Sequence, residues 1–133
     1  MMQRMGMAAA LVAFGATAAF AGDVPVEQAS LGEARITLHV HEFLQDDELA
    51  ALRLVLVNSD ALALFVPKSD GYAAMAVSPD DGFIRDGALV KSAMALADLP
   101  DAATASAEAV KACEALRKGT AACVVVLEVA PKE

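Results

Sequence analysis

The chain has little of the material from which catalytic and metal sites are built. Among 133 residues there is no tryptophan, one tyrosine, two histidines and two cysteines. The shortage of aromatic rings argues against a stacking platform for sugars. The sequence also has no G-x-S-x-G nucleophile turn, no phosphate-binding loop and no G-x-G-x-x-G motif. These absences favour a protein that is not an enzyme and that needs no cofactor.

Basic residues are scarce as well. Lysine and arginine together number 10 against 18 aspartates and glutamates, which gives a net charge of −8. A chain this acidic repels phosphate backbones and anionic lipid surfaces. We therefore expect no nucleic-acid partner.

The longest apolar run lies at the N-terminus. It extends from Met5 to Phe20, follows the single basic residue Arg4, and ends in Ala19-Phe20-Ala21. This order of a basic start, an apolar stretch and an A-x-A site is typical of a secretory signal peptide. The run is shorter than the ~20 apolar residues of a spanning helix, although a retained anchor remains the alternative. The pattern predicts a signal peptide at 1–21, cleavage near Ala21/Gly22, and a periplasmic or secreted mature chain without membrane insertion.

The remaining chain reads as one domain. Residues 22–33 are polar and predict a flexible N-terminal arm, and 34–133 predict a single domain with one core. In the segment ARITLHVHEF, Ile36, Leu38 and Val40 alternate with polar residues. This period of two predicts a half-buried strand.

The later elements follow from caps, turns and apolar runs. The segments with a predicted structure are a helix capped by Asp46 or Asp47, with a strand at 53–57 as the alternative; a short apolar run at 61–67; a buried strand at 72–78; a strand or loop at 88–97; a helix at 101–118; and a central strand at 122–131.

This order predicts an α+β fold. We expect an antiparallel sheet of four to five strands with two helices on one face. If the first helix forms and residues 88–97 are only a loop, the arrangement becomes ferredoxin-like, βαββαβ.

The two cysteines lie at opposite ends of one turn. Cys113 is on the apolar face of the predicted helix, and Cys123 opens the strand that follows Gly119. The chain turns back there and brings the two together, so an exported protein should form a disulfide. The alternatives are a redox-active pair, a metal site or free thiols. The pair lacks the C-x-x-C spacing and the helix N-terminus that lower a thiol pKa.

The same region resembles a small secreted bacterial domain of unknown function. The resemblance spans about residues 72–129 and rests on Tyr72 before an alanine-rich strand, on Ser78 at its end, and on Cys113 and Cys123. Some members of that group carry a 5-aminolevulinate synthase label. That enzyme is a large cytoplasmic pyridoxal-phosphate protein, so the label would be a misannotation for this chain.

One strand face carries the candidate binding groups. Arg35, Thr37, His39 and His41 alternate with the core residues of the first predicted strand. The two imidazoles could hold Zn²⁺ or Cu²⁺ if a third ligand converged. Glu128 could serve only if its strand lies adjacent and on the same face. The plainer interpretation is a solvated strand face.

Four aspartates lie beside glycines, in the triplets SDG, DDG and RDG: Asp70, Asp80, Asp81 and Asp86. Their spacing does not match a calcium loop, so they predict turns.

Two classes of function fit these features. The first is a non-catalytic envelope module, stapled by a disulfide, that binds another envelope protein. The alternative is a small-ligand or metal binder that uses the His39/His41 face.

Overall fold

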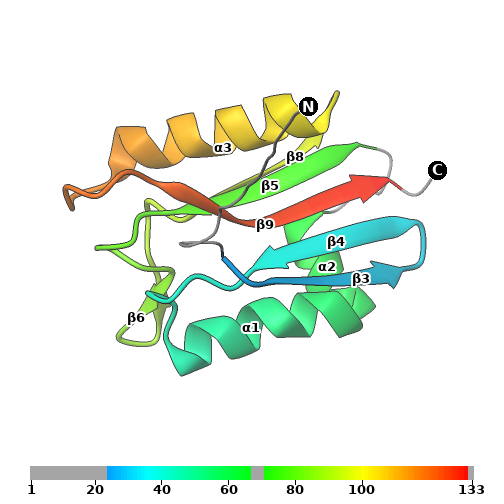
Figure 1. The fold of residues 1–133 in the computed structure, drawn as a ribbon, viewed down its shortest axis with the longest axis horizontal. Helices are drawn as coiled ribbons and strands as arrows, with labels where there is room; N and C mark the ends of the chain where they lie inside the picture. Colours follow the sequence, from blue (N-terminus) through cyan, green and yellow to red (C-terminus); the bar gives the residue numbers. More distant parts are fainter. Residues whose placement is uncertain (1–23, 67–70, 132–133) are drawn as a thin grey trace, which may run out of the picture.

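The computed structural model describes residues 24–66 and 71–131. The predicted signal peptide and Asp70 lie outside the described residues. The elements are β3 (Val26–Leu31), β4 (Ala34–His39), α1 (Asp46–Val57), α2 (Ser59–Phe65), β5 (Tyr72–Val77), β6 (Ile84–Arg85), β7 (Ala88–Leu89), β8 (Met94–Leu99), α3 (Ala102–Leu116) and β9 (Val124–Pro131). The larger sheet has five strands, and Figure 1 shows it between α1 and α3. The predicted α+β class is confirmed.

All neighbouring strands of the large sheet are antiparallel, in the order β3-β4-β9-β5-β8. The last strand in the chain, β9, lies in the middle, as its apolar sequence predicted. β9 pairs with β4 on one side and with β5 on the other. No helix in the described ranges combines the length and apolar character that a bilayer crossing requires.

The segment expected to be a flexible arm is corrected by the structure. Within residues 22–33, Val26–Leu31 forms the edge strand β3, which pairs along its whole length with β4. The hairpin turns at Gly32, whose φ of 60° suits a residue without a side chain. Glu27 on β3 is held by Arg53 of α1, with Nη2 and Oε2 2.7 Å apart.

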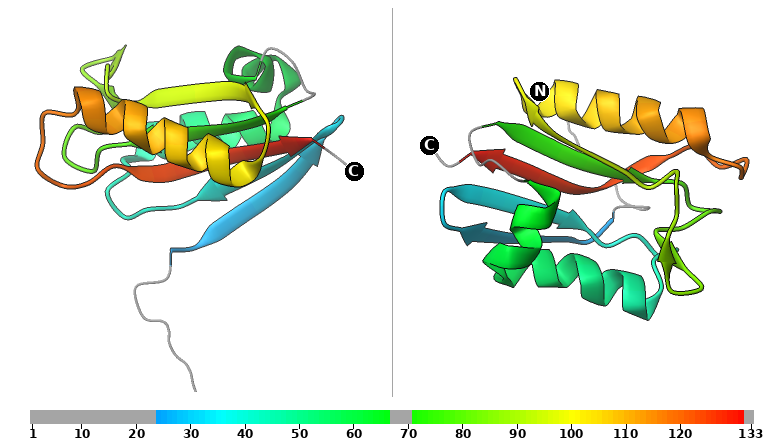
Figure 2. Two further views of the ribbon diagram at one scale, coloured as in Figure 1. Left: turned by 90° about the horizontal axis from the view of Figure 1, so that it is seen from above. Right: turned by 180° about the vertical axis from the view of Figure 1, so that it is seen from behind.

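The helices lie on opposite faces of the sheet, which corrects the expectation that they share one face. Ala73, Met75 and Val77 of β5 pack in the core cluster under α1 and α2. The alternate residues Ala74 and Ala76 pack against α3. Successive side chains of a strand point to opposite faces, so β5 separates two cores. Figures 1 and 2 show α1 and α3 on opposite sides of the sheet. A ferredoxin-like arrangement with both helices on one face is therefore excluded.

The first helical region consists of two helices. The N-cap residue of α1 is Gln45, one residue before the first predicted cap, and the alternative strand at 53–57 does not form. Asn58 then caps α2, because its side chain accepts a hydrogen bond from the N–H of Ala61 at 3.0 Å. The short apolar run after residue 60 is thus part of a helix. The sequence did not predict this helix, because the run is too short to show a helical period.

The segment 88–97 is divided between two sheets. Ala88–Leu89 pairs with β6 in a small hairpin whose turn residues, Asp86 and Gly87, have φ of 56° and 76°. Positive φ at both central residues is the geometry of a tight two-residue hairpin. Met94–Leu99 forms β8 at the edge of the large sheet. The RDG triplet is therefore a hairpin turn, as predicted.

The predicted helix at 101–118 is present as Ala102–Leu116. Asp101 caps it by accepting a hydrogen bond from the N–H of Thr104 at 2.7 Å. Its buried side is narrow: Ala105, Ala109 and Cys113 face the sheet. Cys113 and Cys123 form the predicted disulfide, with Cα atoms 6.2 Å apart.

Candidate functional site

Among the described residues, no helix covers one half of the sheet on the side where α3 lies. α3 packs on β5, β8 and the start of β9. Beyond it, in the described part of the chain, the strands β3, β4 and β9 present their outward side chains to solvent. We call this surface the open face. Its members, related by the cross-strand register, are Val26, Gln28, Ser30, Arg35, Thr37, His39, Glu128 and Ala130.

The alternation along β4 produces the open face. Ala34, Ile36 and Leu38 are buried against α1. Arg35 and Thr37 lie on the opposite side of the strand from these buried residues. Arg35 is exposed and Thr37 is half-buried. The sheet thus fixes the spacing of these polar groups while its other face forms the core.

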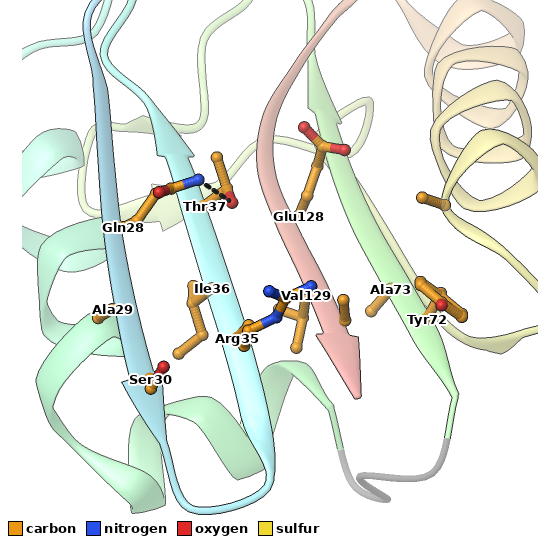
Figure 3. A pocket seen from close by; sticks show the side chains of 12 residues that line it. Gln28, Ala29, Ser30, Arg35, Ile36, Thr37, Tyr72, Ala73, Glu128 and Val129 are labelled. Carbon is orange, nitrogen blue, oxygen red and sulfur yellow. Dashed lines mark hydrogen bonds between the residues drawn. The ribbon is translucent and has the colours of Figure 1, made fainter. Parts of the chain in front are cut away.

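A hollow of about 400 Å³ lies on the open face (Figure 3). Small side chains leave this space: Ser30 on β3, Ala130 on β9, and Ala102 at the start of α3. Tyr72 borders it on the α3 side, and the Arg35 side chain reaches from β4 toward β9. The volume is within the range of small-ligand sites, about 300–1,000 Å³.

Arg35 differs from the other arginines that the structure describes. Arg53 pairs with Glu27, Arg85 with Glu48, and Arg117 with Glu114. Within residues 24–66 and 71–131, Arg35 makes no ion pair and no side-chain hydrogen bond. Its guanidinium keeps all five donors available beside the hollow.

Glu128 lies on a strand next to β4 and on the same face, which is the condition for it to meet the histidines. β9 lies next to β4, and Glu128 is the register partner of Thr37. Its Oε2 lies 2.5 Å from Nε2 of His39. The carboxylate on the open face is therefore already engaged by an imidazole.

His41 does not join this pair. Its Nε2 lies 3.0 Å from the carbonyl oxygen of Val125 and so donates a hydrogen bond to it. Its ring is centred 6.3 Å from that of His39 and stacks at 5.3 Å on Phe43. Among the described residues, no three His, Cys, Asp or Glu side chains are grouped closely enough to hold a metal ion.

The two aspartates of the DDG triplet accept hydrogen bonds from backbone N–H groups. Asp81 accepts hydrogen bonds from the N–H groups of Lys118 and Gly119 at 2.7 and 3.0 Å. Asp80 accepts from Thr120 and Ala121. The hydrogen bond from the N–H of Lys118 is the main cause that holds the pKa of Asp81 below its ordinary value. The DDG triplet thus forms a turn that fixes the loop leading to β9.

Sequence reasoning missed the part of the open face that lies outside β4. Gln28 and Ser30 belong to a segment that was expected to be an arm, and Tyr72 and Ala130 had no assigned role in binding. The signal for β3 was weak, because its core-facing positions begin with Glu27 rather than an apolar residue.

Comparisons with models of known protein families, with curated proteins and with solved structures find no match for this chain.

Proposed function

We propose that this chain is an exported, non-catalytic module that binds an envelope protein through its open face. The observation that carries the proposal is the half of the sheet left uncovered by α3. A sheet face is ordinarily covered by another layer. Here three strands offer a pre-formed surface with a central hollow.

The composition of the open face supports a protein partner. Gln28, Ser30 and Thr37 supply neutral hydrogen-bonding groups, and Arg35 supplies a positive charge. Arginine is enriched at protein interfaces and often dominates their energetics. The backbone that carries these groups is held by cross-strand pairing, so little conformational entropy is lost when a partner binds.

Export is part of the proposal. It rests on the apolar run after Arg4 and on the disulfide, since disulfides persist in oxidising compartments. Intact mass of the chain recovered from the envelope of a producing bacterium should correspond to a start at Gly22, within about two residues of the A-x-A site. A chain that retains Met1 in the membrane fraction would refute this part.

Site-specific photo-crosslinking tests the binding surface. A photoreactive amino acid replaces Ser30 on the open face, and in a matched control it replaces Glu108, which is exposed on α3. We expect one defined adduct from position 30 in intact envelopes and none from position 108. Both variants must show the unmodified protein's thermal unfolding.

A second surface variant checks the adduct. Thr37→Trp adds a bulky uncharged side chain beside the hollow without touching the core, so it should abolish the adduct from position 30. Equal adducts from both positions, or an adduct that Thr37→Trp leaves intact, would show that the open face is not the binding surface.

A further inference from the structure

We infer that the hollow on the open face binds a carboxylate group of the partner, held by the guanidinium of Arg35. The inference rests on the proposed function, since it names the chemistry by which the open face recognises its partner. The relevant carboxylate is one borne by a peptide, at its C-terminus or on an acidic side chain.

The pairing pattern of the arginines points to this ligand. The chain carries 18 acidic residues, and three of the four arginines in the described ranges each contact one of them. Arg35 alone in those ranges is left without such a contact, and it borders the hollow. Guanidinium binds carboxylate through two parallel hydrogen bonds, which favours a planar acid in this position.

The neighbouring groups can complete the site. Gln28 Nε2 donates to Thr37 Oγ1 at 3.5 Å, which leaves the Thr37 hydroxyl proton available to a ligand oxygen. The hydroxyl of Ser30, whose residue pairs with Arg35 across the two strands, lies on the same face. Both neutral donors come from strands that the sheet holds rigidly.

Charge matching favours a carboxylate over a phosphate. Among the described residues that line the hollow, Arg35 is the single cationic one, and one guanidinium neutralises one negative charge. A phosphate carries up to two charges, so one guanidinium leaves part of its charge unneutralised in a protein of net charge −8. Glu128 also lines the hollow, but its carboxylate contacts His39 rather than Arg35.

The test uses the exported, ¹⁵N-labelled protein and three defined probes. N-acetyl-Ala-Ala with a free carboxylate is titrated against its C-terminal amide and against inorganic phosphate. The readouts are the Nε–Hε resonance of Arg35 and the backbone amides of Ser30 and Thr37. We expect saturable shifts with the acid, at least tenfold weaker binding of the amide, and weaker binding of phosphate.

Variants separate a specific contact from general charge. Arg35→Gln should weaken binding of the acid at least tenfold, and Arg35→Lys should weaken it less, because an ammonium keeps the charge but loses the fork. Arg53→Gln removes the same charge from an arginine that already pairs with Glu27, so it should leave binding unchanged.

Several results would overturn the inference. They are no shift at these resonances with the acid, equal binding of acid and amide, tighter binding of phosphate, or full binding by Arg35→Gln. Photo-crosslinking from position 30 in the Arg35→Gln background separates the two proposals. An adduct of unchanged yield there keeps the open face as the binding surface and removes the role of Arg35.

Discussion

The carboxylate of Glu48 on α1 accepts a hydrogen bond from the backbone N–H of Ile84 in β6, at 2.8 Å. The same oxygen accepts from the N–H of Phe83 at 2.7 Å and contacts Arg85, while the other oxygen accepts from the N–H of Gln45 at 2.8 Å. Glu48 is fully buried. A single side chain therefore caps its own helix and fixes the small hairpin against it.

Replacing Glu48 with Gln tests this junction. The amide keeps the size but turns one acceptor into a donor, which then faces N–H groups in the interior. We expect the free energy of unfolding to fall by about 1–3 kcal/mol, the cost of unsatisfied buried groups. Urea denaturation measures it, with Glu108→Gln on exposed α3 as a control that changes stability by less than about 0.5 kcal/mol. Equal effects of both variants would contradict the assigned role.

Stability should depend on pH through the same carboxylate. Burial would raise the pKa of Glu48, but hydrogen bonds from the N–H groups of Gln45, Ile84 and Phe83 and the charge of Arg85 hold that pKa below its ordinary value of 4.5. The native state therefore binds the proton less tightly than the unfolded chain does. The resulting stabilisation is present above the ordinary pKa and is lost as pH falls through the lowered pKa.

We accordingly expect an unfolding free energy that decreases below about pH 5. Asp81 and Glu114, whose pKa values are also lowered by hydrogen bonds, add to this decrease. Glu48→Gln should show a shallower acid limb in urea titrations at each pH. Stability that increases between pH 5 and 3 would refute this account.

The disulfide should stabilise the native fold by restricting the unfolded chain. Cys113 and Cys123 are 10 residues apart, and the chain-entropy estimate for a loop of that size is about 2.5–3 kcal/mol. The double variant Cys113→Ala/Cys123→Ala should lose roughly that amount in urea denaturation. The unreduced wild-type protein, denatured, should show no thiol that reacts with Ellman's reagent. Two reactive thiols in exported protein would contradict the bond.

Zinc and copper provide a test of the alternative function. Because the Nε2 of His41 is engaged by the Val125 carbonyl and the Nε2 of His39 by Glu128, the pair does not present two converging ligands. Calorimetry at pH 7.5 should give no micromolar binding of either ion. Micromolar binding that disappears in His39→Gln/His41→Gln would establish the metal site instead.

The sequence predicted the elements whose periodicity is strong. The alternation around Ile36 and Leu38 marked β4, the Asp101 cap marked the start of α3, and the apolar run in β9 marked a central strand. β3 was missed because Glu27 occupies a core-facing position and is neutralised by Arg53, a contact that only the tertiary structure provides. α2 was missed because seven residues are too few to display a helical period.

The local sequence pattern could not predict that α1 and α3 lie on opposite faces of the sheet. The run Ala73–Val77 is apolar on both faces, which predicts burial but does not say what covers each side. The open face follows from that placement. Its β4 residues were predicted as one polar face, whereas the hollow, and the lack of a partner for Arg35 within the described ranges, depend on β3, β9 and the position of α3.

Because β5 contributes side chains to both cores, neither core can melt while the other persists. Loss of the α3 side would expose Ala74 and Ala76 and release the strand that also carries Met75 on the α1 side. The molecule should therefore open as a single cooperative unit, with coincident transitions in every probe. In native-state hydrogen exchange, the slowest amides should be those of β5 and β9, which open only with the whole fold.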